Sequence, residues 1–246
     1  MGRPLSTAEF AASADYEAKV RPGTSVFDPV LAEAAYRWWC PPGGSVLDPF
    51  AGGSTRGAVA AHLGLRYTGV DLRADQVEAN DRCPAVQSLP KKARPSWLVG
   101  DAAALPAEAG DGHDFILSCP PYHDLEVYSD DERDLSTLGW ADFLVAYRQA
   151  IDLAAVRLAP NRFAAWVIGE VRDPAGRLRG LVPATFDAFA SAGLAPHDEA
   201  VLVTPAGALA LRAGRSFSTR KIARCHQVLL VFCKGDPATA AEAVGR

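Results

Sequence analysis

Short apolar runs alternate with stretches of helical periodicity along most of this 246-residue chain. Five apolar runs predict strands and five periodic stretches predict helices. The strands are expected at 45–48, 67–71, 97–100, 113–118 and 163–169, and the helices at 28–39, 53–63, 74–82, 141–158 and 183–192. Such alternation predicts a doubly wound α/β fold with a mostly parallel sheet.

Two further strands are expected near the end of the chain, at 199–204 and 227–233. Because no convincing helical pattern separates them, the sequence predicts a terminal antiparallel strand pair. The sheet is therefore expected to have seven strands. The sequence shows no internal repeat, low-complexity tract or linker. Residues 1–246 are therefore interpreted as one domain, which begins with an N-terminal arm at 1–27.

Composition excludes several protein classes. Apolar residues make up 49% of the chain and charged residues 22%, which is typical of a folded globular protein. The five cysteines form no CxxC pair and no zinc-like spacing with histidine, so no metal site is predicted and free thiols in a reducing cytoplasm are expected. The sequence shows no signal-peptide pattern and no apolar run long enough to span a membrane.

The loops that follow the first four predicted strands carry acids, glycines and prolines. These loops contain Asp48-Pro49-Phe50-Ala51-Gly52-Gly53, then Asp71-Leu72, then Asp101-Ala102, and then Ser118-Cys119-Pro120-Pro121-Tyr122. In a doubly wound sheet, ligands bind at the carboxyl ends of the strands near the switch point. The four loops are therefore expected to converge on one binding site.

The ligand can be inferred from what each loop offers. The first loop is glycine-rich but lacks the Walker lysine and begins with Asp48, which suits a cationic group better than a pyrophosphate. Asp71, 23 residues later, has the usual place of a carboxylate that receives two ribose hydroxyls. Asp101 would meet an adenine amino group. A ligand with an ammonium group, a ribose and an adenine is S-adenosylmethionine.

These motifs resemble those of the DNA amino-methyltransferases, which methylate the exocyclic nitrogen of adenine or cytosine. The stretch DPFAGGSTRG resembles their cofactor loop, SCPPY their catalytic motif, and VDLRADQV and GDA their second and third cofactor elements. The resemblance runs from about 27 to 235 and is closest in kind to small solitary enzymes of phage and prophage. It implies a class I methyltransferase fold of Rossmann-like type, and it leaves open a pairing with a restriction nuclease.

The resemblance also implies roles for individual residues. Cofactor contacts are expected from Asp48, Pro49, Phe50, Ala51, Gly52, Gly53, Asp71, Leu72, Asp101, Ala102 and Ser118. The catalytic segment would be Ser118, Cys119, Pro120, Pro121 and Tyr122. In this segment Tyr122 would stack on a target base flipped out of double-stranded DNA, and the main-chain carbonyl of Pro120 would accept a hydrogen bond from the target amino group.

The two prolines suit this chemistry. An exocyclic amino nitrogen is a poor nucleophile because its lone pair is delocalised into the ring. Acceptors around it favour the pyramidal form, and the activated sulfonium methyl needs only in-line positioning. Because Pro fixes its own backbone, Pro120 and Pro121 would hold that geometry.

One residue departs from the family pattern. Cys119 stands where the family has Asp, Asn or Ser, and a cysteine sulfur is a poor hydrogen-bond acceptor. Three alternatives therefore stay open. Cys119 could attack C6 of a pyrimidine in a cytosine-C5 methyltransferase. The chain could instead methylate RNA, or it could be a silent relative that binds nucleic acid.

The net charge of −4 is unevenly distributed. The segment 212–224 has no acidic residue and contains the predicted DNA-contacting residues Arg212, Arg215, Phe217, Arg220, Lys221 and Arg224. By contrast, 124–134 is acidic and is interpreted either as a solvated loop or as a lid over the site. Because the chain has no room for a separate target-recognition domain, loops at 123–138 and 205–224 are expected to read the target. The sequence does not indicate the target sequence, the choice of base or the oligomeric state.

Overall fold

The computed structural model describes residues 26–203 and 209–245 of the chain. Seven strands form one sheet in the order β3-β2-β1-β4-β5-β7-β6. Their bounds are β1 Ser45–Asp48, β2 Arg66–Asp71, β3 Ser96–Val99, β4 His113–Ser118, β5 Leu158–Ile168, β6 Ala195–Val203 and β7 His226–Lys234. Strands β1 to β5 pair in parallel, and β7 is antiparallel to both β5 and β6. The predicted seven-stranded doubly wound sheet is confirmed.

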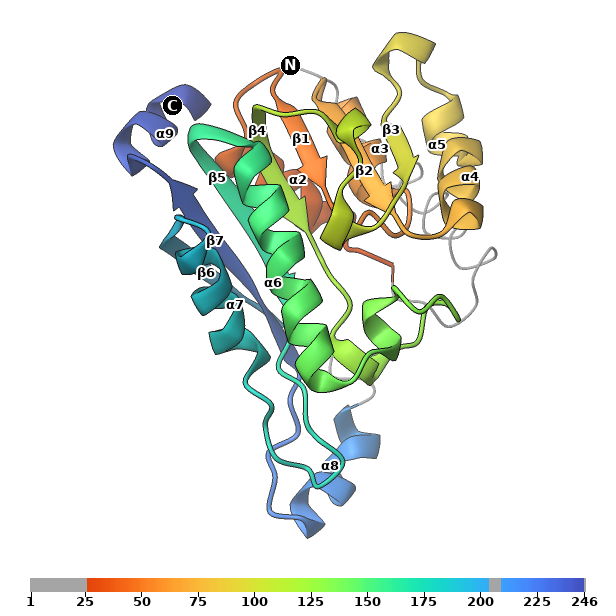
Figure 1. Ribbon diagram of the computed structural model, residues 1–246, viewed down its shortest axis with the longest axis vertical. Helices are drawn as coiled ribbons and strands as arrows, with labels where there is room; N and C mark the ends of the chain where they lie inside the picture. Colours follow the sequence, from red (N-terminus) through yellow and green to blue (C-terminus); the bar gives the residue numbers. More distant parts are fainter. Residues whose placement is uncertain (1–25, 204–208, 246) are drawn as a thin grey trace.

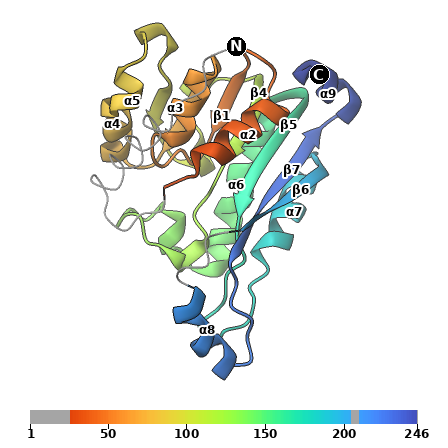
Figure 2. The ribbon, with the colours of Figure 1, turned by 180° about the vertical axis from the view of Figure 1, so that it is seen from behind.

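Helices cover both faces of the sheet (Figures 1 and 2). Buried residues of one cluster join the sheet to α2 Pro29–Trp39, α3 Thr55–His62, α4 Ala74–Arg82, α5 Pro84–Gln87 and α9 Pro237–Val244. A second cluster joins the opposite face to α6 Trp140–Arg157 and α7 Leu181–Ser191. The strands alternate accordingly: Phe115 and Leu117 of β4 belong to the first cluster and Ile116 to the second. The sheet is thus buried on both sides, as parallel sheets are.

The last part of the chain differs from the sequence prediction. Helix α8, Leu209–Ser218, lies between β6 and β7, where no helix was expected. The prediction of a loop at 205–224 is wrong for this part of the chain, because Leu, Ala and Arg are good helix formers. Strand β6 begins at Ala195, four residues before the predicted start at 199. Most of its residues are exposed, so it lacks the alternation that marks a half-buried strand.

Strand β1 lies between β2 and β4, so the chain reverses its direction of winding at β1. The loops after β1, β2 and β4 therefore leave the sheet at the same edge, next to a crevice between oppositely placed helices. Of the predicted arm at 1–27, only Val26 and Phe27 belong to the part that the structure describes. Within 26–203 and 209–245, none of the helices has the length and apolar character that crossing a membrane needs.

Candidate functional site

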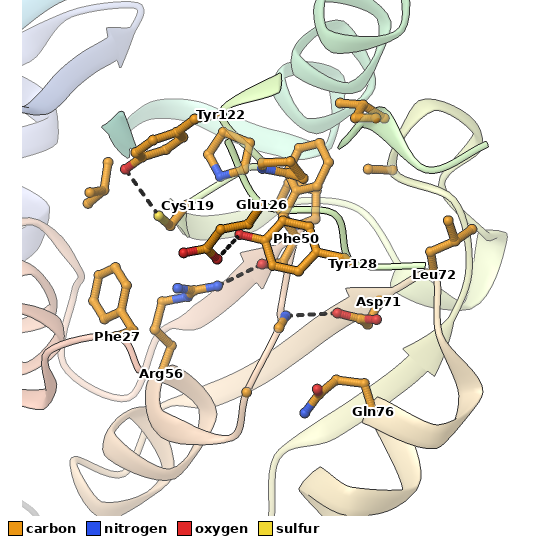
Figure 3. Close-up of a pocket in the computed structure, with 18 of the residues that line it drawn as sticks. Phe27, Phe50, Arg56, Asp71, Leu72, Gln76, Cys119, Tyr122, Glu126 and Tyr128 are labelled. Atoms are coloured by element: carbon orange, nitrogen blue, oxygen red, sulfur yellow. Dashed lines mark hydrogen bonds between the residues drawn. The ribbon is translucent and has the colours of Figure 1, made fainter. Parts of the chain in front are cut away.

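A cavity of about 640 Å³ opens at the carboxyl ends of β1, β2 and β4. Much of its lining comes from four groups of residues, and Figure 3 shows part of this lining. The loop after β1 provides Pro49, Phe50, Gly52 and Gly53; the loops after β2 and β3 provide Asp71, Leu72, Asp101 and Ala102; the loop after β4 provides Cys119, Pro120, Pro121 and Tyr122; and the next segment provides Leu125, Glu126, Tyr128, Arg133, Asp134 and Leu135. The predicted convergence of the four strand-end loops is therefore observed.

Asp71 organises the loop after β1. Its Oδ2 accepts a hydrogen bond from the backbone N–H of Gly52 at 2.9 Å, and its Oδ1 accepts one from that of Arg73 at 2.9 Å. Gly52 has a φ of +52°, and a side chain there would be strained. Asn80 of α4 donates to the Gly52 carbonyl at 2.7 Å and holds the loop from the other side. A carboxylate has about four acceptor positions, so Asp71 keeps capacity for a ligand diol.

The position of Asp71 changes its acidity. Burial raises its pKa to about 6, although the two backbone N–H groups oppose the shift. The carboxylate form is therefore the acceptor above about pH 6, and the neutral acid replaces it below that pH.

This pKa leads to a prediction about ligand binding. We expect the affinity for S-adenosylhomocysteine to fall as the pH drops from 7 to 5, because protonated Asp71 loses acceptor capacity for a ribose diol. Calorimetric titrations at several pH values measure this directly. Asp71→Asn should bind weakly at all pH values in this range and flatten the profile. An unchanged affinity in Asp71→Asn would remove Asp71 from the cofactor site.

Asp101 and Ala102 border the same side of the cavity. Asp101 Oδ1 accepts from the backbone N–H of Ala103 at 2.8 Å and caps a short 3-10 turn at Ala102–Ala104. Asp101 therefore both caps this turn and lines the cavity. Its second oxygen is not used by this cap, which is compatible with the predicted contact to an adenine amino group.

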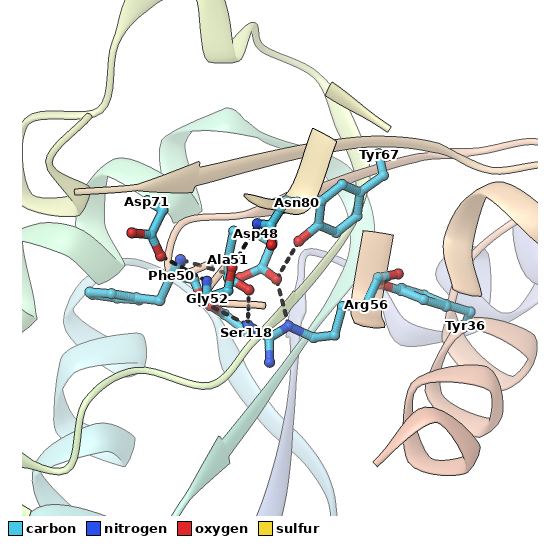
Figure 4. A network of polar contacts seen from close by, with 10 residues as sticks. All are labelled: Tyr36, Asp48, Phe50, Ala51, Gly52, Arg56, Tyr67, Asp71, Asn80 and Ser118. Atoms are coloured by element: carbon cyan, nitrogen blue, oxygen red, sulfur yellow. Dashed lines mark hydrogen bonds and ion pairs between the residues drawn. The ribbon is translucent and has the colours of Figure 1, made fainter. Parts of the chain in front are cut away.

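A buried polar network lies beneath the loop after β1 (Figure 4). Asp48 Oδ2 accepts from Arg56 Nε at 2.6 Å and from the Tyr67 hydroxyl at 2.7 Å. Asp48 Oδ1 accepts from the Ser118 hydroxyl at 2.7 Å. Arg56 also donates to the carbonyls of Phe50 and Ala51, at 2.6 and 3.0 Å. This network ties β1, β2, α3 and β4 together under the floor of the cavity.

Three predicted cofactor residues belong to this floor. Asp48 and Ser118 are fully buried, and Ala51 is 1% exposed. This differs from the expectation that Asp48 attracts a cationic ligand, because its charge is neutralised by Arg56 and its surface is inaccessible. The three residues instead shape the loop that carries Phe50, Gly52 and Gly53.

Cys119 to Tyr122 form the wall opposite Asp71. The Tyr122 hydroxyl lies 3.5 Å from Cys119 Sγ, and a Cβ placed on Gly169 would lie only 3.0 Å from the Tyr122 ring. The ring is therefore tightly packed on one side, and it is 9% exposed. Burial raises the pKa of Cys119, although the Arg56 guanidinium opposes this shift. A protonated thiol is a weak nucleophile, which disfavours the role that a cytosine-C5 mechanism would give it.

The acidic segment after the motif packs over the cavity. Asp134 is 5% exposed and accepts from Ser129 Oγ at 2.7 Å and from the Ser136 backbone N–H and hydroxyl at 2.9 and 2.6 Å. Because Glu126, Tyr128 and Asp134 line the cavity, the segment is a cover for the site and not only a solvated loop.

The residues of the cavity lining that the sequence interpretation missed include Phe27, Arg56, Glu126 and Tyr128. Phe27 comes from the arm, and Arg56 lies with its guanidinium carbon 4.5 Å from the centre of the Phe27 ring. Glu126 and Tyr128 come from the cover, where the Tyr128 hydroxyl donates to Glu126 Oε2 at 2.8 Å. The contact of Arg56 with Asp48 could have been predicted from the sequence. An arginine eight residues after Asp48, in the first turn of the next helix, can face back toward that carboxylate. The other three follow only from tertiary packing.

The predicted DNA-contacting residues lie on and after α8, which projects away from the sheet (Figure 1). Arg212 and Arg215 fall on α8, and their side chains lie outside what the structure describes. Phe217 is 65% exposed, and Arg220 and Arg224 are exposed as well. Lys221 is partly exposed, with its amino group packed against Gly176. The basic strip is therefore not part of the cavity wall.

The residues present fit S-adenosylmethionine. Asp71 offers acceptor capacity at a glycine-lined wall where backbone and ligand can approach closely, and Asp101 and Leu72 continue the same side. A volume of about 640 Å³ lies within the range of cofactor pockets and leaves room beside the cofactor for a second group.

No family model and no curated protein sequence matches this chain. Several solved structures match it by their fold. TrmN from Thermus thermophilus superposes with a TM-score of 0.58 at 22% identity over 90% of this chain, which spans only 53% of TrmN. A TehB-like SAM-dependent methyltransferase from Corynebacterium glutamicum gives 0.52 at 15% identity, covering 92% of this chain and 98% of its own.

The N-methyltransferase NodS from Bradyrhizobium japonicum, in complex with S-adenosyl-L-homocysteine, gives a TM-score of 0.54 at 13% identity, covering 92% of this chain and 99% of its own. At these identities the likeness concerns the fold alone. The chain has the fold of the class I S-adenosylmethionine-dependent methyltransferases.

Proposed function

We propose that this protein transfers the methyl group of S-adenosylmethionine to an exocyclic amino group of DNA, adenine N6 or cytosine N4, in a base flipped out of the duplex. One observation carries the proposal. A single cavity has the Gly52 and Asp71 wall on one side and the Cys119–Tyr122 wall on the other. This is the arrangement that methyl transfer between a nucleoside cofactor and a planar base requires.

The wall after β4 would position the base. Tyr122 would stack on one face of it, and the Pro120 carbonyl would accept a hydrogen bond from the target amino group, which draws the lone pair out of conjugation. The bound cofactor supplies a sulfonium that activates the methyl group. Pro120 and Pro121 fix the backbone of the wall, so that nitrogen and methyl carbon would be held in line about 3 Å apart.

The basic strip would contact the DNA backbone. Phe217, Arg220 and Arg224 are exposed on the projection formed by α8 and the following loop. The phosphate groups of DNA would attract such a strip whatever the base sequence. The strip would therefore supply affinity, and the cavity would select the target base.

Binding measurements check this role. We expect Arg220→Ala and Arg224→Ala each to weaken duplex binding and to lower the slope of log K against log salt by about 0.9, one phosphate contact each. Fluorescence anisotropy with labelled duplex at several salt concentrations gives both values. Arg82→Ala, which changes an exposed arginine of α4 paired with Glu78, is the matched control. Slopes equal to the control would place the DNA elsewhere.

Product analysis tests the function itself. The protein is incubated with tritiated S-adenosylmethionine and unmodified genomic DNA, and the nucleosides are analysed by mass spectrometry after digestion. N6-methyladenine or N4-methylcytosine would support the proposal and identify the base. 5-Methylcytosine would assign Cys119 as the nucleophile. Product only with RNA as acceptor would transfer the proposal to RNA, and no product on either would indicate a silent relative.

A further inference from the structure

The proposed reaction lacks one group at its expected place. Where the DNA amino-methyltransferases carry Asp, Asn or Ser, this chain has Cys119, whose sulfur accepts hydrogen bonds weakly. The preceding residue does not replace it. Ser118 is fully buried, donates its hydroxyl to Asp48 at 2.7 Å, and receives the Phe50 N–H at 3.3 Å.

Glu126 lies beside this place. It lines the cavity four residues after Tyr122, and in Figure 3 its carboxylate points into the space between Cys119 and Arg56. Burial raises the pKa of the Cys119 thiol, and the charges of Asp48 and Glu126 add to this shift.

Tyr128 holds the Glu126 carboxylate in this position. The Tyr128 hydroxyl donates to Oε2 at 2.8 Å, and burial together with Glu126 raises the pKa of Tyr128, so the hydroxyl remains a donor. One oxygen of Glu126 is thus oriented by a neutral donor from the same covering segment. The carboxylate is thereby held at the cavity wall.

The other carboxylates of the cavity are placed for different tasks. Asp28 caps α2 through the Val30 N–H, and Asp134 is buried among Ser129 and Ser136. Asp71 and Asp101 follow β2 and β3, on the wall opposite Cys119. Among the described residues that line the cavity, Glu126 is therefore the carboxylate adjacent to the catalytic wall.

We propose that Glu126 is the hydrogen-bond acceptor and proton acceptor for the target amino group, in the role that the residue before Pro120 has in the family. This inference rests on the proposed amino methylation. The nitrogen lone pair forms the new N–C bond to the methyl group while the C–S bond breaks. The electron pair of the broken bond stays on sulfur, so that the cofactor leaves as a neutral thioether. The nitrogen, now positive, releases one proton to the Glu126 carboxylate, which returns it to water.

The test compares three variants by their single-turnover rate on duplex DNA and by their affinity for S-adenosylhomocysteine. Glu126→Gln keeps the shape and the contact with Tyr128 but cannot take the proton. Its rate is expected to fall about 100-fold or more at unchanged affinity. Glu132→Gln changes an exposed acid of the same segment and should retain the wild-type rate. Cys119→Asp added to Glu126→Gln places a carboxylate at the family position and should recover the rate at least about tenfold.

The outcomes separate this inference from the function on which it rests. A loss in Glu126→Gln with recovery in the double variant supports it. An active wild type whose rate is unchanged by Glu126→Gln overturns the role of Glu126 and leaves the amino methylation standing. A loss that Cys119→Asp does not recover, or that comes with weaker cofactor binding, assigns Glu126 to the structure of the cover. A wild type that yields no methylated amino base overturns both.

Discussion

Asp48→Ala is expected to lower the free energy of unfolding by about 3–5 kcal/mol, which is the usual cost of leaving a buried charge without its partner. Asp48 is fully buried and accepts hydrogen bonds from Arg56, Tyr67 and Ser118. Its removal leaves the Arg56 guanidinium, also buried, without the carboxylate that compensates its desolvation. Urea denaturation of the wild type and the variant, followed by circular dichroism, measures the difference.

Two further variants make this result specific. Glu78→Ala removes the carboxylate of an exposed pair with Arg82, in which the side chains are 58% and 70% exposed, and should cost less than about 1 kcal/mol. Arg56→Met in the Asp48→Ala background removes the unpaired charge and should recover part of the stability. If Asp48→Ala keeps wild-type stability and loses only cofactor binding, then Asp48 contacts the ligand directly and the structural role is wrong.

Tyr122→Ala is expected to reduce methyl transfer to DNA by roughly 5- to 150-fold while the affinity for S-adenosylhomocysteine stays unchanged. Stacking of a base on an aromatic ring contributes about 1–3 kcal/mol, and the Tyr122 ring, which lines the cavity, would supply it. The two readouts are kcat/KM with a duplex substrate and calorimetric titration with S-adenosylhomocysteine. Because Tyr122 is 9% exposed, the melting temperature of the variant must also be measured.

The matched control for Tyr122 keeps the ring. Tyr122→Phe loses only the hydroxyl, whose partner is Cys119 Sγ at 3.5 Å, and should retain most of the turnover. Equal losses in Tyr122→Phe and Tyr122→Ala would assign the effect to the hydroxyl and its contact with Cys119. Full turnover in Tyr122→Ala would rule out the stacking role.

The position of Asp71 was predictable from the chain, and that of α8 was not. Asp71 ends a buried strand, and the carboxyl ends of parallel strands meet at the switch point of any doubly wound sheet, so its place follows from the order of elements. Helix α8 contradicts the predicted loop. Its leucines, alanines and arginines have high helix propensity, and a glycine or serine does not by itself prevent a helix.

Asp48 marks the limit of reasoning from residue type. Its position after β1 was predicted correctly, but its carboxylate is buried and paired with Arg56 beneath the cavity. Whether a ligand cation or the Arg56 guanidinium pairs with this carboxylate depends on side-chain packing. The spacing of residues along the chain does not predict that choice. Glu126 is a similar case, because a covering segment without regular secondary structure has no period from which its contacts could be predicted.

The sequence by itself determined the seven-stranded sheet, the four strand-end loops and the resemblance to amino-methyltransferases, because hydrophobic periodicity and short motifs are local properties of the chain. Only the tertiary structure decided that Asp48, Ala51 and Ser118 form the floor of the cavity and that Glu126 and Tyr128 face it. Those outcomes depend on contacts between segments far apart in the chain, where burial and pairing select one neighbour among several of suitable chemistry.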